Sequence, residues 1–152
     1  MEINRIVRLL IDTNLLLYAA NQDAPGHERS SEFVNEHVAG TIPWCLTWPV
    51  IYEFLRVSTH PKVFPQPLTV GEAFSFLAPV FTSPALTILS PTRRHLPMLN
   101  QTIQEIAPPS GNLFHDIAIA VTLREHAVPE IATADTDFLQ FRFLKVINPL
   151  VP

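Results

Sequence analysis

The sequence contains a single cysteine, Cys45, and no apolar run that approaches the roughly 20 residues needed to span a bilayer. One cysteine excludes an internal disulfide and a thiolate-rich zinc site, and we expect Cys45 to be a small buried apolar residue. The amino-terminal segment MEINRIVRLL also lacks the long apolar region and the cleavage site of a signal peptide. Together these absences favour a cytoplasmic protein.

Positive charge is scarce as well. Ten lysine and arginine residues stand against 14 acidic residues, which gives a formal net charge of −4 at pH 7. A protein of this charge does not attract nucleic acid through general counterion release. If the ligand is a polyanion, a bound divalent cation must reverse the sign of an acidic pocket locally.

Apolar residues make up 47% of the 152 residues, which is enough for one packed core, so we predict a single domain over residues 1–152. Segments of strand character are predicted at 6–12, 41–48, 85–90, 130–135 and 145–149. Helical patterns lie between them, at 14–21, 27–40, 49–59, 69–81, 92–107 and 113–128, with a short helical turn at 136–141. This alternation predicts an α/β fold with a mainly parallel sheet that is covered on both faces.

Two carboxylates lie where predicted strands end. Asp12 ends the first strand in LLIDTN, and Asp135 ends the fourth in IATADTDF, with Asp137 two residues later. Parallel sheets bind their ligands beyond the carboxyl ends of the strands, so this is the expected place for a site. An aspartate at such a junction is also a favoured helix N-cap, which leaves each residue open to either role.

Two further acids lie on predicted helices that are otherwise apolar. Glu53, in WPVIYEFLRV, could form an exposed pair with Arg56, and Asp116, in GNLFHDIAIAV, could interact favourably with a helix N-terminus. Burying several carboxylates without compensation is costly, and a hard divalent cation removes that cost. Oxygen ligands without cysteine suit Mg²⁺ or Mn²⁺, which serve phosphodiester chemistry.

The histidines show no metal-binding spacing. None of the six fits H-x-x-x-H or H-E-x-x-H, and we expect surface or capping roles for all of them. They are His27, His37, His60, His95, His115 and His126.

Four segments, taken in order and covering nearly the whole chain, resemble PIN-domain ribonucleases of the VapC toxin type. They are LLIDTNLLLYA, TWPVIYEFLRV, GNLFHDIAIAVTLREHAVPEIATADTDF and LKVINPL. The four-acid signature of that family matches Asp12, Glu53, Asp116 and Asp135. Asp137 matches a further acid of many members, and Asn14 and Thr133 match polar positions that line the acidic pocket and can orient ligands there.

The resemblance implies a three-layer α/β/α fold and a metal-dependent endoribonuclease that is usually a homodimer and is paired with an antitoxin that occludes its active site. Mg²⁺ or Mn²⁺ would be held by the matched acids, with Asp12 and Asp116 as the first choices for direct ligands. Glu53 would bind directly or through water, and Asp135 and Asp137 would support these ligands.

Phosphate positioning needs cations, and the candidates are Arg56, one helical turn from Glu53, and the pair Arg93 and Arg94. Arg56 has a second interpretation, in which it only neutralises the acids, and for Arg93 and Arg94 we favour a solvated helix start over a phosphate contact. Two other functions stay open: an RNA-processing nuclease that is not a toxin, and a PIN-like interaction module that does not cleave. The proline-rich segment 61–91 follows no motif that indicates dimer contacts or RNA selection.

Overall fold

The computed structural model describes residues 6–152, so the first five residues of the predicted domain lie outside the described part. The strands are β1 (Leu9–Ile11), β2 (Trp44–Thr47), β3 (Leu86–Leu89), β4 (Glu130–Ala132) and β5 (Lys145–Ile147). The helices are α1 (Thr13–Ala20), α2 (His27–Ala39), α3 (Trp48–Ser58), α4 (Val70–Phe81), α5 (His95–Glu105), α6 (Leu113–Glu125) and the 3-10 helix η1 (Thr136–Gln140). The predicted elements are thus present, and all five strands are shorter than predicted.

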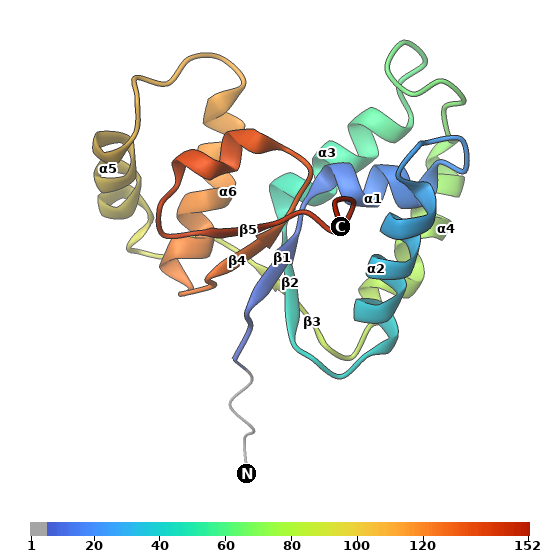
Figure 1. Cartoon of the computed structure of the whole chain (residues 1–152), viewed down its shortest axis with the longest axis horizontal. Helices are drawn as coiled ribbons and strands as arrows, with labels where there is room; N and C mark the ends of the chain where they lie inside the picture. The colour runs from blue at the N-terminus through green and yellow to red at the C-terminus, as the bar shows by residue number, and fades with distance from the viewer. Residues whose placement is uncertain (1–5) are drawn as a thin grey trace.

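The strands form one parallel sheet in the order β3-β2-β1-β4-β5. In Figure 1 the helices α1 to α4 lie on one side of this sheet, and α5 and α6 lie on the other. Right-handed crossovers require this arrangement, because the chain first builds the sheet outward from β1 through β2 to β3 and then continues on the opposite side of β1. The predicted three-layer α/β/α fold is confirmed.

The reversal of strand order lies between β1 and β4. These two strands are neighbours in the sheet although more than 100 residues separate them, and Ile11 is in register with Ala132. The segments that follow them leave toward opposite faces, which opens a crevice at the carboxyl edge of the sheet. Asp12 and Thr133, the next residues of each chain segment, therefore lie side by side at this crevice.

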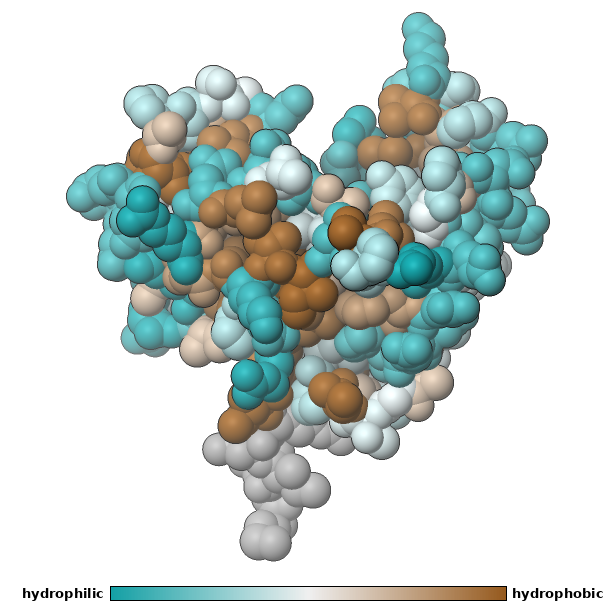
Figure 2. Space-filling view, in the orientation of Figure 1, coloured by the Kyte–Doolittle hydropathy of each residue, from teal (hydrophilic) through white to brown (hydrophobic). Residues whose placement is uncertain are grey.

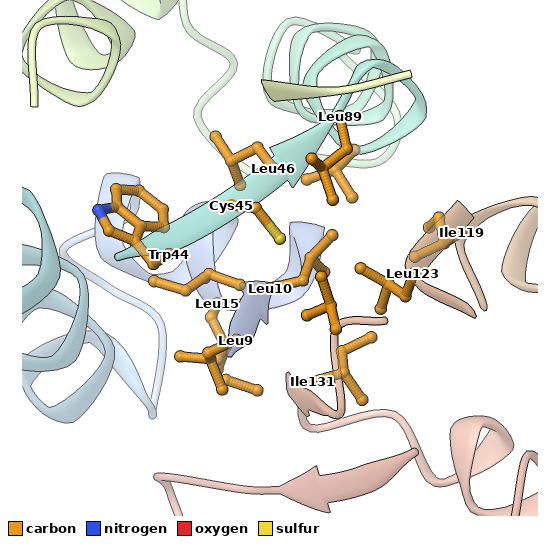
Figure 3. Packing of buried hydrophobic residues seen from close by; sticks show 14 of the residues in the cluster. Leu9, Leu10, Leu15, Trp44, Cys45, Leu46, Leu89, Ile119, Leu123 and Ile131 are labelled. Carbon is orange, nitrogen blue, oxygen red and sulfur yellow. The ribbon is translucent and has the colours of Figure 1, made fainter. Parts of the chain in front are cut away.

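The core is centred on β1, and its three residues are all buried. Leu10 is paired with Cys45 on one side and with Ile131 on the other, and none of the three is exposed to solvent. Figure 3 shows Trp44 and Leu123 among the apolar side chains that surround them. Cys45 is buried as predicted, and burial raises the pKa of its thiol.

Helix α6 is buried along most of its length, and its last residue anchors the segment that leads into α5. The Glu125 carboxylate accepts hydrogen bonds from the Thr92 amide (2.8 Å) and hydroxyl (2.7 Å), and it pairs with His95 Nδ1 at 2.7 Å. Burial raises the pKa of Glu125, but these hydrogen bonds outweigh burial and hold that pKa below its ordinary value.

The same anchor places Arg93 and Arg94 at the exposed start of α5, which agrees with the interpretation favoured for this pair. The Arg94 guanidinium donates to the backbone carbonyl of Glu125, and the neighbouring Arg93 is exposed. Glu125 lies nine residues after Asp116 on α6, about 13 Å along the helix. Arg93 and Arg94 are therefore at the opposite end of α6 from the acids, and they are not positioned to contact a phosphate there.

No helix within residues 6–152 has both the length and the apolar character that crossing a bilayer requires.

Replacing Leu10 by alanine should destabilise the fold by about 3 kcal/mol. The substitution leaves a cavity at the central strand, and the paired strands on both sides prevent the neighbouring side chains from moving in to fill it. Urea unfolding measures this loss. Ile42→Ala is the control, since Ile42 is 68% exposed and should change stability by less than about 0.5 kcal/mol. An equal effect of the two substitutions would contradict this description of the core.

Candidate active site

An acidic pocket of about 180 Å³ lies at the carboxyl edge of the sheet. Its lining residues are Asp12, Thr13, Asn14, Leu17, Glu53, His115, Asp116 and Asp135. They come from the start of α1, from α3, from the first turn of α6 and from the segment after β4. Figure 2 shows the surface hollowed between two lobes, and the helices of the two sides of the sheet form these lobes in Figure 1. The structure thus brings together four acids that are distant in the sequence.

Asp12 is both a helix cap and a wall of the pocket. Its Oδ1 accepts the Thr13 N–H at 2.8 Å, which caps α1. Its Oδ2 accepts the Thr133 hydroxyl at 2.7 Å and the Asn14 amide at 3.2 Å. Burial raises the pKa of Asp12, and the hydrogen bonds from Thr133 and Thr13 counteract part of that rise. The carboxylate is therefore fixed in position, whichever role it has.

Thr133 joins the ends of β1 and β4. Besides donating to Asp12, its hydroxyl accepts hydrogen bonds from the Asn14 amide (2.9 Å) and from the Asp135 backbone N–H (3.0 Å). The Asn14 carbonyl in turn accepts the Ala134 N–H at 3.1 Å. This network orients Asp12 and shapes the segment that carries Asp135.

Asp135 lies slightly later than predicted relative to its strand. β4 ends at Ala132, and the Asp135 N–H bonds the Thr133 hydroxyl. The Asp135 side chain then caps η1 by accepting the Asp137 N–H at 2.9 Å. Asp116, Asp135 and Asp137 each offer a carboxylate oxygen within 4.8 Å of the other two, a geometry that could hold a metal ion.

Asp116, in the first turn of α6, faces the strongest concentration of negative charge. Burial, together with the negative charges of Asp135, Asp12, Asp137 and Glu53, raises the pKa of Asp116 to about 7. Within residues 6–152 its carboxylate accepts no hydrogen bond. Its charge is therefore left without a partner from the described protein.

Glu53 occupies the pocket wall and also forms the predicted pair with Arg56. The guanidinium donates to both carboxylate oxygens, at 2.7 and 3.1 Å. These hydrogen bonds hold the pKa of Glu53 below its ordinary value, although partial burial opposes them. The Arg56 side chain is 60% exposed, so the pair lies at the protein surface beside the pocket. Glu53 can therefore pair with Arg56 and still belong to the acidic pocket.

His115 was not among the residues predicted for the site. It was expected on the surface or at a helix cap, but its side chain lines the pocket. Its position in the sequence could have indicated this, because His115 directly precedes Asp116 and so shares the first turn of α6. Its single occurrence, without a second histidine at ligand spacing, made that signal weak.

Comparison with known proteins is consistent with this geometry. The family model for the PIN domain matches residues 9–144. This chain belongs to the PIN-domain family. Ribonuclease VapC33 of Mycobacterium tuberculosis is 31% identical to it over 142 residues, which cover 93% of this chain and 98% of that protein. Ribonuclease VapC25 of the same organism is 31% identical over 140 residues, with 92% and 97% covered.

Solved structures share the fold of this PIN-domain chain. Mycobacterium tuberculosis VapC20, described as a sarcin-ricin loop cleaving toxin, has a TM-score of 0.66 at 13% identity, with 92% of this chain and 99% of that chain covered. DNA-bound VapBC from Salmonella typhimurium has a TM-score of 0.66 at 15% identity, with 95% and 99% covered. At such identities the likeness concerns the fold.

Thr133→Val should destabilise the PIN domain by about 1 to 2 kcal/mol, because Asp12 loses a donor while Asn14 and the Asp135 N–H lose an acceptor. Thr133→Ser keeps the hydroxyl and should lose much less. Urea unfolding of both variants checks the network. It would be refuted if serine and valine were equally destabilising.

Asp116→Asn should stabilise the metal-free protein at pH 8. The folded-state pKa of Asp116, about 7, lies above its ordinary value of 3.8, so the folded chain holds the extra proton and stability falls as pH rises from about 4 to about 7. The expected gain is about 1 to 2 kcal/mol, since water screens a half-buried charge. Thermal unfolding in EDTA at pH 8 and at pH 4 measures it, and at pH 4 the difference should nearly vanish.

The matched control for that experiment is Glu32→Gln, an exposed acid on α2. Adding Mg²⁺ should reverse the order of stability at pH 8, because a cation that binds only the folded wild type stabilises it. If Asp116→Asn were less stable than the wild type in EDTA at pH 8, ionised Asp116 would not be destabilised by its burial and its acidic neighbours.

Proposed function

We propose that this chain is a Mg²⁺- or Mn²⁺-dependent endoribonuclease, the toxin of a toxin-antitoxin pair, that hydrolyses RNA phosphodiester bonds. The observation that carries the proposal is the convergence of Asp12, Glu53, Asp116 and Asp135 on one pocket at the point where strand order reverses. Relatives that are 31% identical over nearly their whole length are named ribonucleases, which supports the same chemistry here.

The donor set fits a hard divalent cation. Asp116, Asp135 and Asp137 bring three carboxylate oxygens within 4.8 Å of one another, and no sulfur or paired histidine is present among them. Asp12 and Asp116 are assigned as direct ligands, with Asp135 and Asp137 close enough to Asp116 to join it. Glu53 would reach the cation directly or through water, and its present partner is Arg56.

When bound, the cation would lower the pKa of a water molecule and offset the charge that develops on the scissile phosphate. The chain's own residues set the geometry for this reaction. Thr133 and Asn14 hold Asp12 in one orientation, so that no reorganisation is needed when substrate binds. Arg56 keeps Glu53 ionised and, being largely exposed, is the proposed contact for an RNA phosphate.

The proposed protein partners are a cognate antitoxin and a second copy of the chain. Solved structures with this fold include VapBC complexes, among them VapBC2 of Rickettsia felis bound to a promoter fragment. On this chain, α3 and α4 leave Trp48, Tyr52 and Phe74 exposed around an apolar groove of about 380 Å³. Exposed apolar surface of this extent supports association with another protein.

The test of the proposed activity is incubation of the purified protein with total cellular RNA, with and without Mg²⁺ or Mn²⁺. Discrete fragments should appear only with metal, and Asp116→Asn should reduce the rate about a hundredfold or more, since even residues that merely orient metal ligands contribute 10- to 100-fold. Glu32→Gln should cleave like the wild type. Fragments that persist in EDTA and in Asp116→Asn would refute the assignment.

Two other outcomes would select the alternative functions. Metal binding without cleavage of any RNA would favour a PIN-fold interaction module. Cleavage without growth arrest in an expressing bacterium, compared with the Asp116→Asn variant, would favour an RNA-processing nuclease that is not a toxin.

A further inference from the structure

His115 differs from the other histidines of the chain in what its ring contacts. A ring hydrogen bond is present at His27, His37, His60, His95 and His126. Within residues 6–152 the His115 ring makes none, although it lines the acidic pocket. A ring nitrogen that carries hydrogen is therefore available at the site.

The other N–H and O–H donors among the side chains that line the pocket are already engaged. The Asn14 amide donates to Asp12 and to Thr133, and the Thr13 hydroxyl donates to the Val50 carbonyl at 3.4 Å. The Arg56 guanidinium, which lies beside the pocket and does not line it, uses two of its five N–H groups on the oxygens of Glu53. Among the side chains that line the pocket, His115 is thus the one with an unused N–H donor in the described part of the chain.

Helix stability does not explain a histidine at this place. Positive charge stabilises the carboxyl end of a helix and is unfavourable at its amino end, where His115 lies. His126, at the C-cap of the same helix, has the favourable position and bonds the Ser90 carbonyl at 2.8 Å. The two histidines of α6 therefore offer a matched comparison.

We propose that His115 contacts the RNA substrate at the pocket by donating a ring N–H to a non-bridging oxygen of a phosphodiester. The inference rests on the proposed nuclease function and adds a substrate-binding residue to it. When ionised, Asp12, Asp116 and Asp135 present only acceptors to a polyanion, so a donor among the lining side chains adds a contact that orients the phosphate, beside the one proposed for Arg56. Neutral and protonated imidazole both carry an N–H, so the contact does not depend on the charge of the ring.

The test measures binding of short single-stranded RNA by fluorescence anisotropy, in Mg²⁺ and in an Asp12→Asn background that prevents cleavage. Asparagine is itself a good N-cap, so this background keeps the cap of α1. His115→Ala should weaken binding about tenfold, the factor expected for one hydrogen bond to a charged group. His126→Ala, at the other end of α6, should leave it unchanged.

Conservative replacements separate a hydrogen bond from a structural role. An asparagine amide approximates the position of Nδ1, and a glutamine amide approximates Nε2, so one of His115→Asn and His115→Gln should restore most of the binding. Mn²⁺ affinity of the His115→Ala single variant, measured by titration calorimetry, should equal that of the wild type. A loss of Mn²⁺ binding would overturn the inference by making the ring a metal ligand.

The two proposals fail in different ways. Wild-type cleavage together with equal RNA binding by Asp12→Asn and its His115→Ala derivative would overturn the role of His115 and leave the nuclease intact. If the wild type neither cleaves nor binds RNA, the proposed function fails and this inference fails with it. If the wild type cleaves but Asp12→Asn does not bind, the KM for cleavage is compared instead, and an unchanged KM in His115→Ala overturns the inference.

Discussion

The parallel pairing of β1 with β4 is the constraint on which the site depends. It joins segments more than 100 residues apart and sets Ile11 in register with Ala132, so that Asp12 and Thr133 meet directly beyond the sheet. The apolar pairing of buried strands provides the free energy that holds a carboxylate at 5% exposure beside three other acids. Without this register, neither the cap of α1 nor the hydroxyl bridge could form.

The acids of the pocket differ in how the protein compensates their charge. Asp12 accepts three hydrogen bonds, Asp135 caps η1, and Glu53 is bound by Arg56. Asp116 alone among these four has no such partner within the described residues, and burial and its acidic neighbours raise its pKa to about 7. Hydrogen bonds thus compensate the charge of three of the acids. The charge of Asp116 is uncompensated, and a bound cation would relieve its repulsion with the other three.

Much of this was predictable from the sequence. Short strands buried on both faces are nearly continuous in apolarity, so β1 and its terminal Asp12 were predicted from local pattern alone. Glu53 and Asp116 stood out as acids on otherwise apolar helices, but several directions around a helix axis are open, so the local pattern left their structural interpretations open until the family resemblance was considered. Arg94 lies at an exposed helix start, as favoured, but its contact with the Glu125 carbonyl, 31 residues away in sequence, has no signal in the local pattern.

His115 and Asp116 show what a local pattern cannot settle. Both lie in the first turn of α6, and neither side chain has a hydrogen-bond partner within residues 6–152, whereas the polar groups around them do. One offers a negative oxygen and the other an N–H donor. A phosphodiester bound to a divalent cation presents the complementary pair, a positive charge and a negative oxygen, a few ångströms apart. In the proposed function these two groups without hydrogen bonds act together, as the surface of α6 that recognises a metal-bound phosphate.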